Sequence, residues 1–375
     1  MNEKRGKVFV GMSGGVDSSV SAALLQKDGY EVRGVFIKVW QPDFLPCTWR
    51  EERRDAMRAA AHLGIPFLTL DLEKEYKEGV VDYMIAEYSA GQTPNPDVMC
   101  NKHVKFGAFL NFAINNGADY IATGHYATNQ STPRSHLGTP LQGETLDLEN
   151  VLRAGLDKEK DQSYFLWTLT QGQLGHILFP VGAFQKSEVR KLAAQFGLPN
   201  ADKKDSQGLC FMGPVDMRDF LKHYIPSVGG AVLDRNGIPI GTHDGSIFYT
   251  IGQRHGFVTD KKIVNSGALY VVSKNMKENT ITVHSRDLDL EKTVELSKFS
   301  VGSINLIGGV KNDGMTIKCA VRIRHGGELH SGELILSTDH DGEFHFANNI
   351  SISVAPGQSS VFYDGDTCLG GGIVA

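Results

Sequence analysis

The chain has 375 residues, of which 41% are hydrophobic and 22% charged, and its net charge is −5. This length predicts two or three domains, and the composition excludes collagen, coiled coil and wholesale disorder. No stretch approaches the roughly 20 apolar residues that cross a bilayer, and Met1–Val10 has no apolar signal core, so we expect a cytoplasmic protein. The acidic balance argues at first against a nucleic-acid partner. Residues 1–62 and 151–225 carry a small positive excess, so a polyanion site must be local.

The first 125 residues alternate strand and helix patterns. The pattern predicts four strands, over Lys7–Gly11, Glu31–Val39, Pro66–Leu72 and Tyr120–Thr123. It predicts three helices between them, over Ser18–Lys27, Arg50–His62 and Glu73–Tyr88, and a further helical stretch over Lys102–Asn115. Strands separated by helices indicate crossover connections and therefore a parallel sheet.

The second part of the chain changes character. Asn129–Asn150 reads as a polar loop or hairpin, followed by helices predicted over Asp161–Leu169, Ser187–Phe196 and Met217–Tyr224. Beyond them come short β-rich runs between Gly, Asn and Asp turns: Ala268–Ser273, Thr280–His284, Thr316–Arg324, Glu333–Ser337, Glu343–Phe346 and Ser351–Val354. Their close spacing predicts one or two small barrels or sandwiches.

The most informative segment reads GMSGGVDSS, from Gly11 to Ser19. It follows an apolar strand and opens a helix, so its backbone N–H groups and the helix dipole favour an anion such as a diphosphate. Asp17 is unexpected in an anion cradle and suggests either a Mg²⁺ ligand or a helix cap. The segment lacks the Gly-Lys-Ser/Thr of a P-loop and the spacing of the dinucleotide fingerprint. A simple tight turn with a Ser or Asp cap is the alternative.

With these residues the segment resembles the PP-loop of the N-type ATP pyrophosphatases. The resemblance implies that ATP is cleaved between its α and β phosphates, that AMP passes to a carbonyl oxygen, and that the loop holds pyrophosphate. It implies ATP binding by Gly11, Met12, Ser13, Gly14, Gly15, Val16, Asp17 and Ser18.

The five cysteines lack metal-type C-x-x-C spacing, so in a cytosolic chain they should be reduced thiols. Cys100 follows the proline-rich loop Thr93–Met99. We expect it at a helix start, where the dipole favours the thiolate, with Asp97 as a cap or a base. Cys210 lies in Asp205–Phe211, after two lysines that would lower its pKa. Each could instead be a buried structural residue, which is the reading we keep for Cys47, Cys319 and Cys368.

Both cysteine segments together resemble those of the tRNA-specific 2-thiouridylases. Further matching motifs run in order along the chain: Thr123–Ala127, Lys160–Leu166, Phe179–Gly182, Ile251–Gly256, Val321–His325 and Ala355–Ser359. The resemblance covers essentially the whole chain. Two positions depart from it. Ile37 stands where the family has Met, in the same apolar role, and His325 stands where Tyr is frequent, although His can also stack on a base.

The resemblance implies an α/β fold, with a doubly wound, Rossmann-like parallel sheet followed by two small β-rich domains. We expect a PP-loop catalytic domain at 1–211, a central α+β domain at 212–280 and a C-terminal β-barrel at 281–375. It further implies 2-thiolation of the wobble uridine in the tRNA anticodon loop, with ATP and Mg²⁺ and without a metal held by the protein. Sulfur would come from a persulfide relay protein or a cysteine desulfurase.

The resemblance also assigns roles to residues. Cys210 receives the persulfide, Cys100 is the partner thiol and Asp97 the general base, while Ile37 and Gly124 lie near the nucleotide. The tRNA contacts would be Asn95, Pro96, Asp97, His125, Lys160, Asp161, Gln162, Arg324, His325 and Gln358. Whether Cys100 attacks the persulfide or only closes the disulfide stays open, as does an iron–sulfur cluster in place of the persulfide. Another PP-loop ligase and a nucleotide-sensing RNA-binding module are the competing hypotheses.

Overall fold

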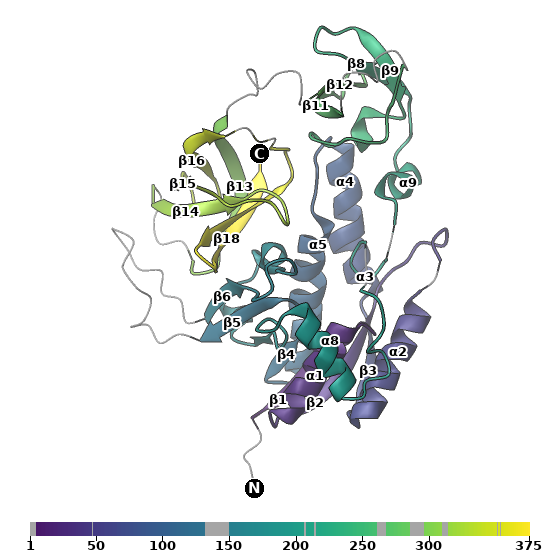
Figure 1. The fold of residues 1–375 in the computed structure, drawn as a ribbon, viewed down its shortest axis with the longest axis vertical. Helices are drawn as coiled ribbons and strands as arrows, with labels where there is room; N and C mark the ends of the chain where they lie inside the picture. Colours follow the sequence, from purple (N-terminus) through teal and green to yellow (C-terminus); the bar gives the residue numbers. More distant parts are fainter. Residues whose placement is uncertain are drawn as a thin grey trace.

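The computed structural model describes residues 5–46, 48–131, 150–205, 208–213, 215–260, 268–285, 296–309, 314–350, 352 and 354–375. The described strands form three β-sheets (Figure 1). A parallel sheet with helices lies at one end, and two β-rich units lie at the other. Cys47, Ser206, Gln207 and most of the predicted hairpin Asn129–Asn150 lie outside the described residues.

The first sheet is wholly parallel, in the order β3-β2-β1-β4-β7. Its strands are β1 (Lys7–Gly11), β2 (Glu31–Lys38), β3 (Phe67–Asp71), β4 (Tyr120–Ala122) and β7 (Ile177–Leu178). Because successive side chains point to opposite faces, Val8 and Val10 pack with α1 and α2, whereas Phe9 packs with the helices that follow β3. Helices therefore cover both faces, and the predicted doubly wound α/β fold is confirmed.

Most of the helices that precede the middle sheet agree with the sequence pattern in position, but not always in type. They are α1 (Val16–Lys27), α2 (Trp49–Leu63), α3 (Glu73–Tyr76), the π-helix η1 (Lys77–Asp82), α4 (Tyr83–Ser89), α5 (Pro96–Met99), the π-helix η2 (Cys100–Phe109), α6 (Leu110–Asn115), α7 (Gln171–Leu174), α8 (Lys186–Gln195) and α9 (Met217–Lys222). The helix predicted over Asp161–Leu169 is wrong. Only a 3₁₀ turn, Ser163–Leu166, forms there, because the Asp161 carboxylate accepts from the backbone N–H and the hydroxyl of Ser163 and so holds a tight local turn.

The two later units are β-rich, as the sequence predicts. The middle sheet has the order β10-β9-β8-β12-β11, with strands β8 (Gly230–Leu233), β9 (Pro239–His243), β10 (Val258–Thr259), β11 (Leu269–Asn275) and β12 (Thr280–Ser285). The expected boundary between residues 280 and 281 falls inside β12, so the division at 211/212 and 280/281 stays a prediction. The last of the predicted β-rich runs was Ser351–Val354. Ser351 and Ser353 lie outside the described residues, and Ile352 and Val354 are not in a strand.

The C-terminal strands close into a barrel, since β13 pairs with both β16 and β18. The strands are β13 (Leu296–Leu306), β14 (Thr316–Arg322), β15 (His330–Leu336), β16 (Gly342–Ile350), β17 (Ser359–Asp364) and β18 (Thr367–Val374). The hairpin β5 (Ala127–Ser131) and β6 (Asn150–Ala154) of the first unit joins β18 at its edge. The barrel is thus hydrogen-bonded to the α/β unit.

All three units meet at Thr93, in the loop before α5. The Thr93 N–H donates to the carbonyl of Pro356 in the barrel, at 2.9 Å, and its hydroxyl lies 3.2 Å from that of Thr250 in the middle unit. A Cβ on Gly357 would come 2.7 Å from Thr93 N, so the barrel turn approaches this loop as only glycine allows. The loop that leads to Asp97 and Cys100 is therefore fixed by parts of the chain far away in sequence.

Candidate functional site

The strand order reverses between β1 and β4, and ligands of open α/β sheets bind outside the carboxyl ends of the strands at such a point. β1 ends at Gly11, and the PP-loop segment Gly11–Ser19 runs from there into α1, whose N-cap is Gly15. β4 ends next to it and continues into Gly124. A Cβ on Gly124 would lie 2.8 Å from Ser18 N. The PP-loop after β1 and the loop after β4 are therefore in direct contact at the carboxyl end of the sheet.

The PP-loop has the geometry of an anion cradle. Gly14 has φ +79°, and a Cβ there would lie 2.4 Å from the carbonyl oxygen of Glu52 in α2. The Asn200 side chain stabilises the loop by donating to the carbonyls of Gly14 and Gly15, at 3.0 and 3.2 Å. The first N–H groups of α1 are left without helical partners, as at every helix start. These features fit the phosphates of ATP.

Asp17 does not cap α1, so that alternative is wrong: no side chain caps this helix. Its carboxylate instead accepts from Lys186 Nζ at 2.7 and 2.8 Å and from the Tyr126 hydroxyl at 2.9 Å. Lys186 also lies 2.9 Å from Asp205, on the segment that leads to Cys210. Lys186 therefore links the PP-loop to the cysteine segment through two ion pairs.

A cavity of about 510 Å³ runs from the PP-loop to Cys210. Most of the predicted site residues line it: Gly11, Met12, Ser13, Gly15, Val16, Asp17, Ser18, Ile37, Asp97, Gly124, His125, Lys160, Gln162, Cys210 and His325. The others do not: Gly14, Asn95, Pro96, Cys100, Asp161, Arg324 and Gln358. The structure thus brings the expected nucleotide loop and the expected sulfur acceptor to a single chamber.

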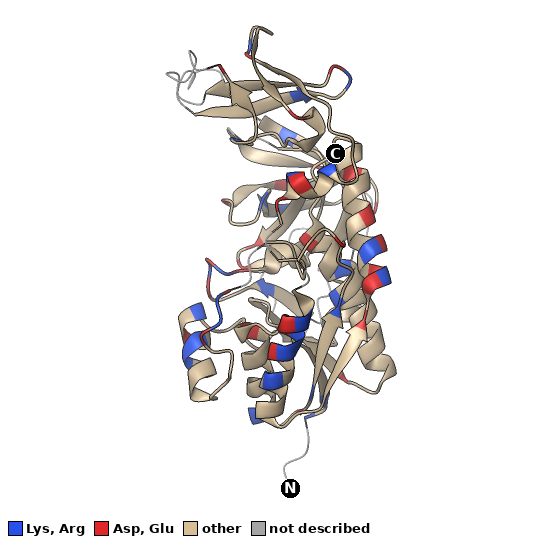
Figure 2. Ribbon diagram, turned by 90° about the vertical axis from the view of Figure 1, so that its right-hand side faces the viewer, with Lys and Arg blue, Asp and Glu red and all other residues tan. Residues whose placement is uncertain are grey.

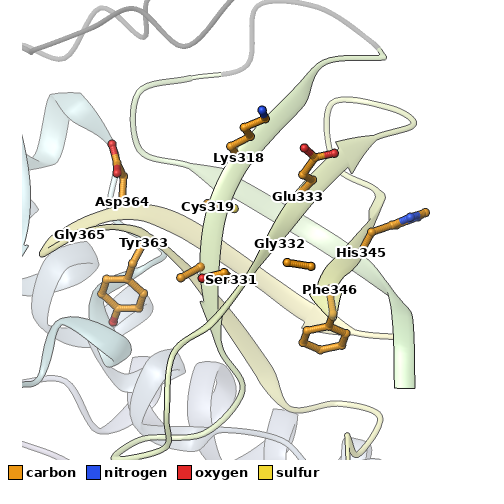
Figure 3. Close-up of a pocket in the computed structure, with 12 residues that line it drawn as sticks. Lys318, Cys319, Ser331, Gly332, Glu333, His345, Phe346, Tyr363, Asp364 and Gly365 are labelled. Carbon is orange, nitrogen blue, oxygen red and sulfur yellow. The ribbon is translucent and has the colours of Figure 1, made fainter. Parts of the chain in front are cut away.

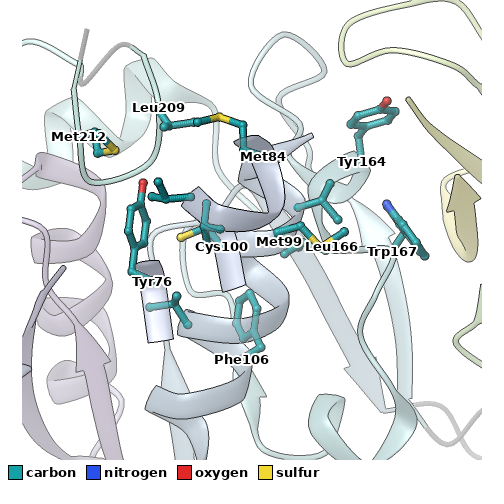
Figure 4. Packing of buried hydrophobic residues seen from close by; sticks show 14 of the residues in the cluster. Tyr76, Met84, Met99, Cys100, Phe106, Tyr164, Leu166, Trp167, Leu209 and Met212 are labelled. Carbon is teal, nitrogen blue, oxygen red and sulfur yellow. The ribbon is translucent and has the colours of Figure 1, made fainter. Parts of the chain in front are cut away.

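Cys100 is not at the free N-terminal end of a helix, because α5 continues into η2 at this residue without a break. Asn95 caps the helix, accepting from the Val98 N–H at 3.3 Å, and Pro96 is its first residue. Cys100 lies in the second turn, fully buried among the residues in Figure 4. Burial, and then the hydrogen bond with Cys210, raises the pKa of its thiol well above the ordinary value. The expected thiolate at Cys100 is therefore wrong.

Cys210 has the opposite electrostatic environment. It sits in a tight turn in which Leu209 and Gly213 pair and Phe211 has φ +66°. The hydrogen bond from Cys100 lowers the pKa of Cys210 to about 7, with Lys105 acting in the same direction and burial against it. Cys210 is thus the thiolate of the pair, and both thiols are free.

Asp97 connects α5 to the Cys210 turn. Its Oδ1 accepts from the Cys210 backbone N–H at 3.1 Å, while the Tyr76 hydroxyl donates to the Cys210 carbonyl at 2.8 Å. Both contacts hold the backbone of Cys210, which is one of the residues that line the cavity. Asn95 and Pro96 form the helix start, and their expected contact with the base stays a prediction.

The predicted tRNA residues fall into two groups. Asp161 is 3% exposed and accepts from Arg322 at 3.1 Å, so in this structure it supports the turn that leads into Ser163–Leu166. Gln162 accepts from the Tyr126 N–H, and Lys160 pairs with Asp205 at 3.2 Å. In this structure these three residues make contacts within the protein, beside the cavity. Their contact with tRNA stays a prediction.

Arg324 and His325 are exposed, at the end of the barrel that faces the cavity. The His325 ring lies 4.6 Å from that of Phe165, which fits a stacking surface, while Gln358 is half-buried next to the Thr93 loop. Basic and acidic residues are interspersed along the chain (Figure 2). This mixture agrees with a local rather than a global attraction for RNA.

His125 is held as a neutral ring. Its Nδ1 lies 2.7 Å from the Thr123 hydroxyl and its Nε2 3.4 Å from Lys105 Nζ. Because a lysine ammonium can only donate, Nε2 is the acceptor and Nδ1 carries the proton. Burial, and then Lys105, lowers the pKa of His125 well below its usual value.

Sequence reasoning missed three residues of the site: Lys105, Lys186 and Asn200. Lys105 Nζ lies 3.1 Å from the Cys210 sulfur. Each of the three reaches its partner across more than 100 positions of sequence, so no local motif marks it. One local signal was present: Lys105 follows Cys100 by five residues. This spacing brings two side chains together only in a π-helix, whose backbone hydrogen bonds join residues i and i+5.

A second cavity, of about 570 Å³, lies on the barrel wall between β14, β15 and β16 (Figure 3). It contains Cys319, and burial raises the pKa of this thiol to about 12. Lys318 and Glu333 are cross-strand neighbours on the same wall. A protonated thiol without a phosphate loop offers no equivalent chemistry, so we place the site in the first cavity. Among the described residues no group of three or more His, Cys, Asp or Glu gathers as a metal site would require.

Three family models match successive parts of the chain: the tRNA methyl transferase HUP domain over residues 6–214, the tRNA methyl transferase PRC-barrel domain over 218–285, and the aminomethyltransferase beta-barrel domain over 296–374. Full-length relatives are named for thiolation instead. The tRNA-specific 2-thiouridylase MnmA of Listeria monocytogenes serovar 1/2a is 42% identical over 371 residues, which are 98% of this chain and 94% of the relative. This chain belongs to the tRNA-specific 2-thiouridylase family.

Other 2-thiouridylases agree. MnmA of Bacillus velezensis is 41% identical over 374 residues, with 98% of this chain and 94% of the relative covered. MnmA of Streptococcus mutans is 40% identical over 376 residues, with 98% and 95% covered. Among solved structures, a 4-thiouridine synthetase in complex with RNA and ATP matches with a TM-score of 0.36 and 18% identity, over 59% of this chain and 50% of that one. None of the helices in the described residues is long and apolar enough to cross a membrane.

Proposed function

We propose that this 2-thiouridylase converts the wobble uridine of tRNA to 2-thiouridine, using ATP and a persulfide sulfur donor. The observation that carries the proposal is the single cavity that joins the PP-loop to the Cys210 thiolate. A sulfur acceptor so placed can reach a base that has just been adenylated. The free thiols and the two substrates support a place of action in the cytoplasm.

Adenylation comes first in the proposed sequence. The uridine O2 attacks the α-phosphorus of ATP, the bond to the β-phosphate breaks, and pyrophosphate leaves into the PP-loop cradle. An amide-like oxygen is a poor leaving group, and the attached AMP makes it a good one. Asp17 fits a Mg²⁺ that arrives with the nucleotide, since Mg²⁺ binds through one or two carboxylates plus phosphates. The ion would neutralise charge at the phosphates. Lys186 would then leave its ion pair with Asp17 and donate to a phosphate oxygen instead.

Sulfur acceptance is assigned to Cys210. Its thiolate attacks the terminal sulfur of the donor's persulfide, the donor's remaining sulfur leaves as a thiolate, and Cys210 becomes a persulfide. The donor is a relay protein or a cysteine desulfurase. Cys100 is 0% exposed, so this cysteine is out of reach of an external protein and serves as the second thiol.

Two routes complete the transfer. Cys100 attacks the Cys210 sulfur and frees hydrosulfide, which adds to C2, or the persulfide adds to C2 and Cys100 then attacks the same Cys210 sulfur. In both routes the C2–O bond breaks, AMP leaves, and a Cys100–Cys210 disulfide forms that an external thiol reduces. Asp97, three residues before Cys100 and near enough to raise the pKa of that thiol, is the proposed base for the Cys100 proton.

The base must leave the anticodon stack to enter the cavity. We propose that Arg324 and His325 hold the anticodon loop at the rim, with Gln358 nearby and with Lys160 and Gln162 on the wall. His325 against Phe165 offers a stacking platform.

The decisive experiment incubates the protein with unmodified tRNA, ATP, Mg²⁺ and a persulfide donor, and measures 2-thiouridine by mass spectrometry of nucleosides. We expect product from the wild type and from a Cys319→Ser control, which changes a thiol outside the site, and none from Cys210→Ser. Product formation by a folded Cys210→Ser protein would exclude the proposed sulfur path and favour another PP-loop ligase.

A further inference from the structure

Lys105 is the cationic group in contact with the sulfur-accepting cysteine. Its Nζ lies 3.1 Å from the Cys210 sulfur and 3.4 Å from His125 Nε2, and it stands 5.5 Å from the centre of the Phe211 ring. Within the described part of the chain, no carboxylate lies at ion-pair distance from it. The sulfur is therefore the anion that this ammonium directly faces.

The local helix geometry explains this position. Cys100 and Lys105 both belong to the π-helix η2, whose hydrogen bonds join residues five apart. The helix thus presents a thiol and an ammonium to the same turn of the Cys210 segment. In a regular α-helix, residues four apart share a face instead, and Lys105 would point away from Cys100. π-helical turns often occur at functional sites.

We propose that Lys105 is a positioning residue for sulfur acceptance: its ammonium holds the Cys210 sulfur as an anion at the cavity wall, ready to attack the donor's persulfide. This inference rests on the proposed function and assigns it one further residue. Lys105 need not touch tRNA or ATP in this role.

The charges around Cys210 support the assignment. The Cys100 hydrogen bond lowers the Cys210 pKa most, burial raises it, Lys105 lowers it and Asp97 raises it. The Tyr76 hydroxyl donates to the backbone carbonyl of Cys210. Without Lys105, burial and Asp97 would be opposed by a single neutral hydrogen bond. The Lys105 pKa itself is raised, because the two cysteines and Asp97 outweigh burial, so the ammonium stays charged.

The step that Lys105 promotes is the first sulfur transfer. A Cys210 thiolate forms a bond to the terminal sulfur of R–S–SH, the S–S bond of the donor breaks, and R–S⁻ leaves. The nucleophile must be the thiolate. A Cys210 held as a neutral thiol would need a base, whereas one held beside Lys105 is ready to attack.

The test is the rate at which iodoacetamide alkylates Cys210 as a function of pH, followed by peptide mass spectrometry without tRNA or ATP. Lys105→Met keeps the length of the side chain and removes the charge, and Lys105→Arg keeps the charge. Lys102→Met, an exposed lysine on the same helix, is the matched control. At pH 7 we expect Lys105→Met to react on the order of tenfold more slowly, since a free thiol is only a few per cent ionised there. We expect Lys105→Arg to recover most of the rate and Lys102→Met to match the wild type.

An unchanged pH profile in folded Lys105→Met would overturn the proposal. If that variant does not fold, the wild type still decides: a Cys210 midpoint near the free value of about 8.5 would show that no cation holds the sulfur. Because alkylation needs neither substrate, these outcomes are independent of the proposed function. Absence of 2-thiouridine from the wild type would reject the function and leave the Lys105–Cys210 result standing.

Discussion

Gly14 is the residue of the PP-loop with the least room for change. Its φ is +79°, and an added Cβ would lie 2.4, 3.1 and 3.2 Å from the carbonyl oxygen, carbonyl carbon and Cα of Glu52. All three atoms are backbone of α2, so no side-chain rotation relieves the contact. For Gly14→Ala we expect about 1–2 kcal/mol from the left-handed backbone and about 1–3 kcal/mol from overpacking.

The combined cost, about 2–5 kcal/mol by those two contributions, must appear as lost stability, as a displaced loop, or as both. The assay is thermal unfolding with and without ATP and Mg²⁺. We expect Gly14→Ala either to lower Tm by about 4 °C or more or to lose the rise in Tm that ATP gives the wild type. Gly172→Ala is the control, because a Cβ at Gly172 meets nothing within 4 Å. A Gly14→Ala protein with wild-type Tm and a wild-type response to ATP would refute the reasoning.

Three other predictions concern the barrel arginines and the thiolate. Arg322→Met leaves the buried Asp161 carboxylate without its ion pair, so we expect about 3–5 kcal/mol less stability in urea unfolding; a loss under about 1 kcal/mol would contradict this role. Arg324→Ala changes an exposed side chain, so we expect a stability change within about 0.5 kcal/mol. We expect weaker tRNA binding, with the slope of log affinity against log salt concentration reduced by about 1. An unaltered slope would show that Arg324 is not in the interface. The Cys210 pKa of about 7 is below the free value, so the thiolate is lost on acidification. Sulfur transfer from the donor to Cys210 should therefore rise as pH increases through about 7 and level off about one unit higher, and a rate independent of pH across this range would argue against a titrating Cys210.

The sequence predicts the strand–loop–helix of the PP-loop well, because its chemistry is local. Gly14, the serines and the apolar strand before them lie within a few residues of one another. The start of the Cys100 helix was also readable, since Asn95 is a favoured N-cap and Pro96 a favoured first residue. The prediction placed the start at Cys100 and therefore expected a thiolate at Cys100 as well as a lowered pKa at Cys210, and only the second expectation agrees with the structure.

The rest of the site depends on contacts that no local pattern specifies. Lys105 and Cys210 are 105 residues apart, and Lys186 and Asp17 are 169 residues apart. The pKa difference between the two cysteines comes from the hydrogen bond between them, from the burial of Cys100 and from the charge of Lys105. Sequence motifs gave the candidate residues, but only the fold shows which thiol is ionised and which carboxylate is already paired.

The contacts of Thr93 have a consequence for biosynthesis. The loop before α5 is held by the carbonyl of Pro356, which leaves the ribosome long after the α/β unit has been made. Domains generally fold as units, the N-terminal one first, during synthesis. A nascent α/β unit therefore lacks one of the contacts that hold the loop before Asp97 and Cys100 until the barrel has been made. We therefore expect the loop at Thr93 to reach its final position only after the barrel, which carries Arg324 and His325, has folded against it.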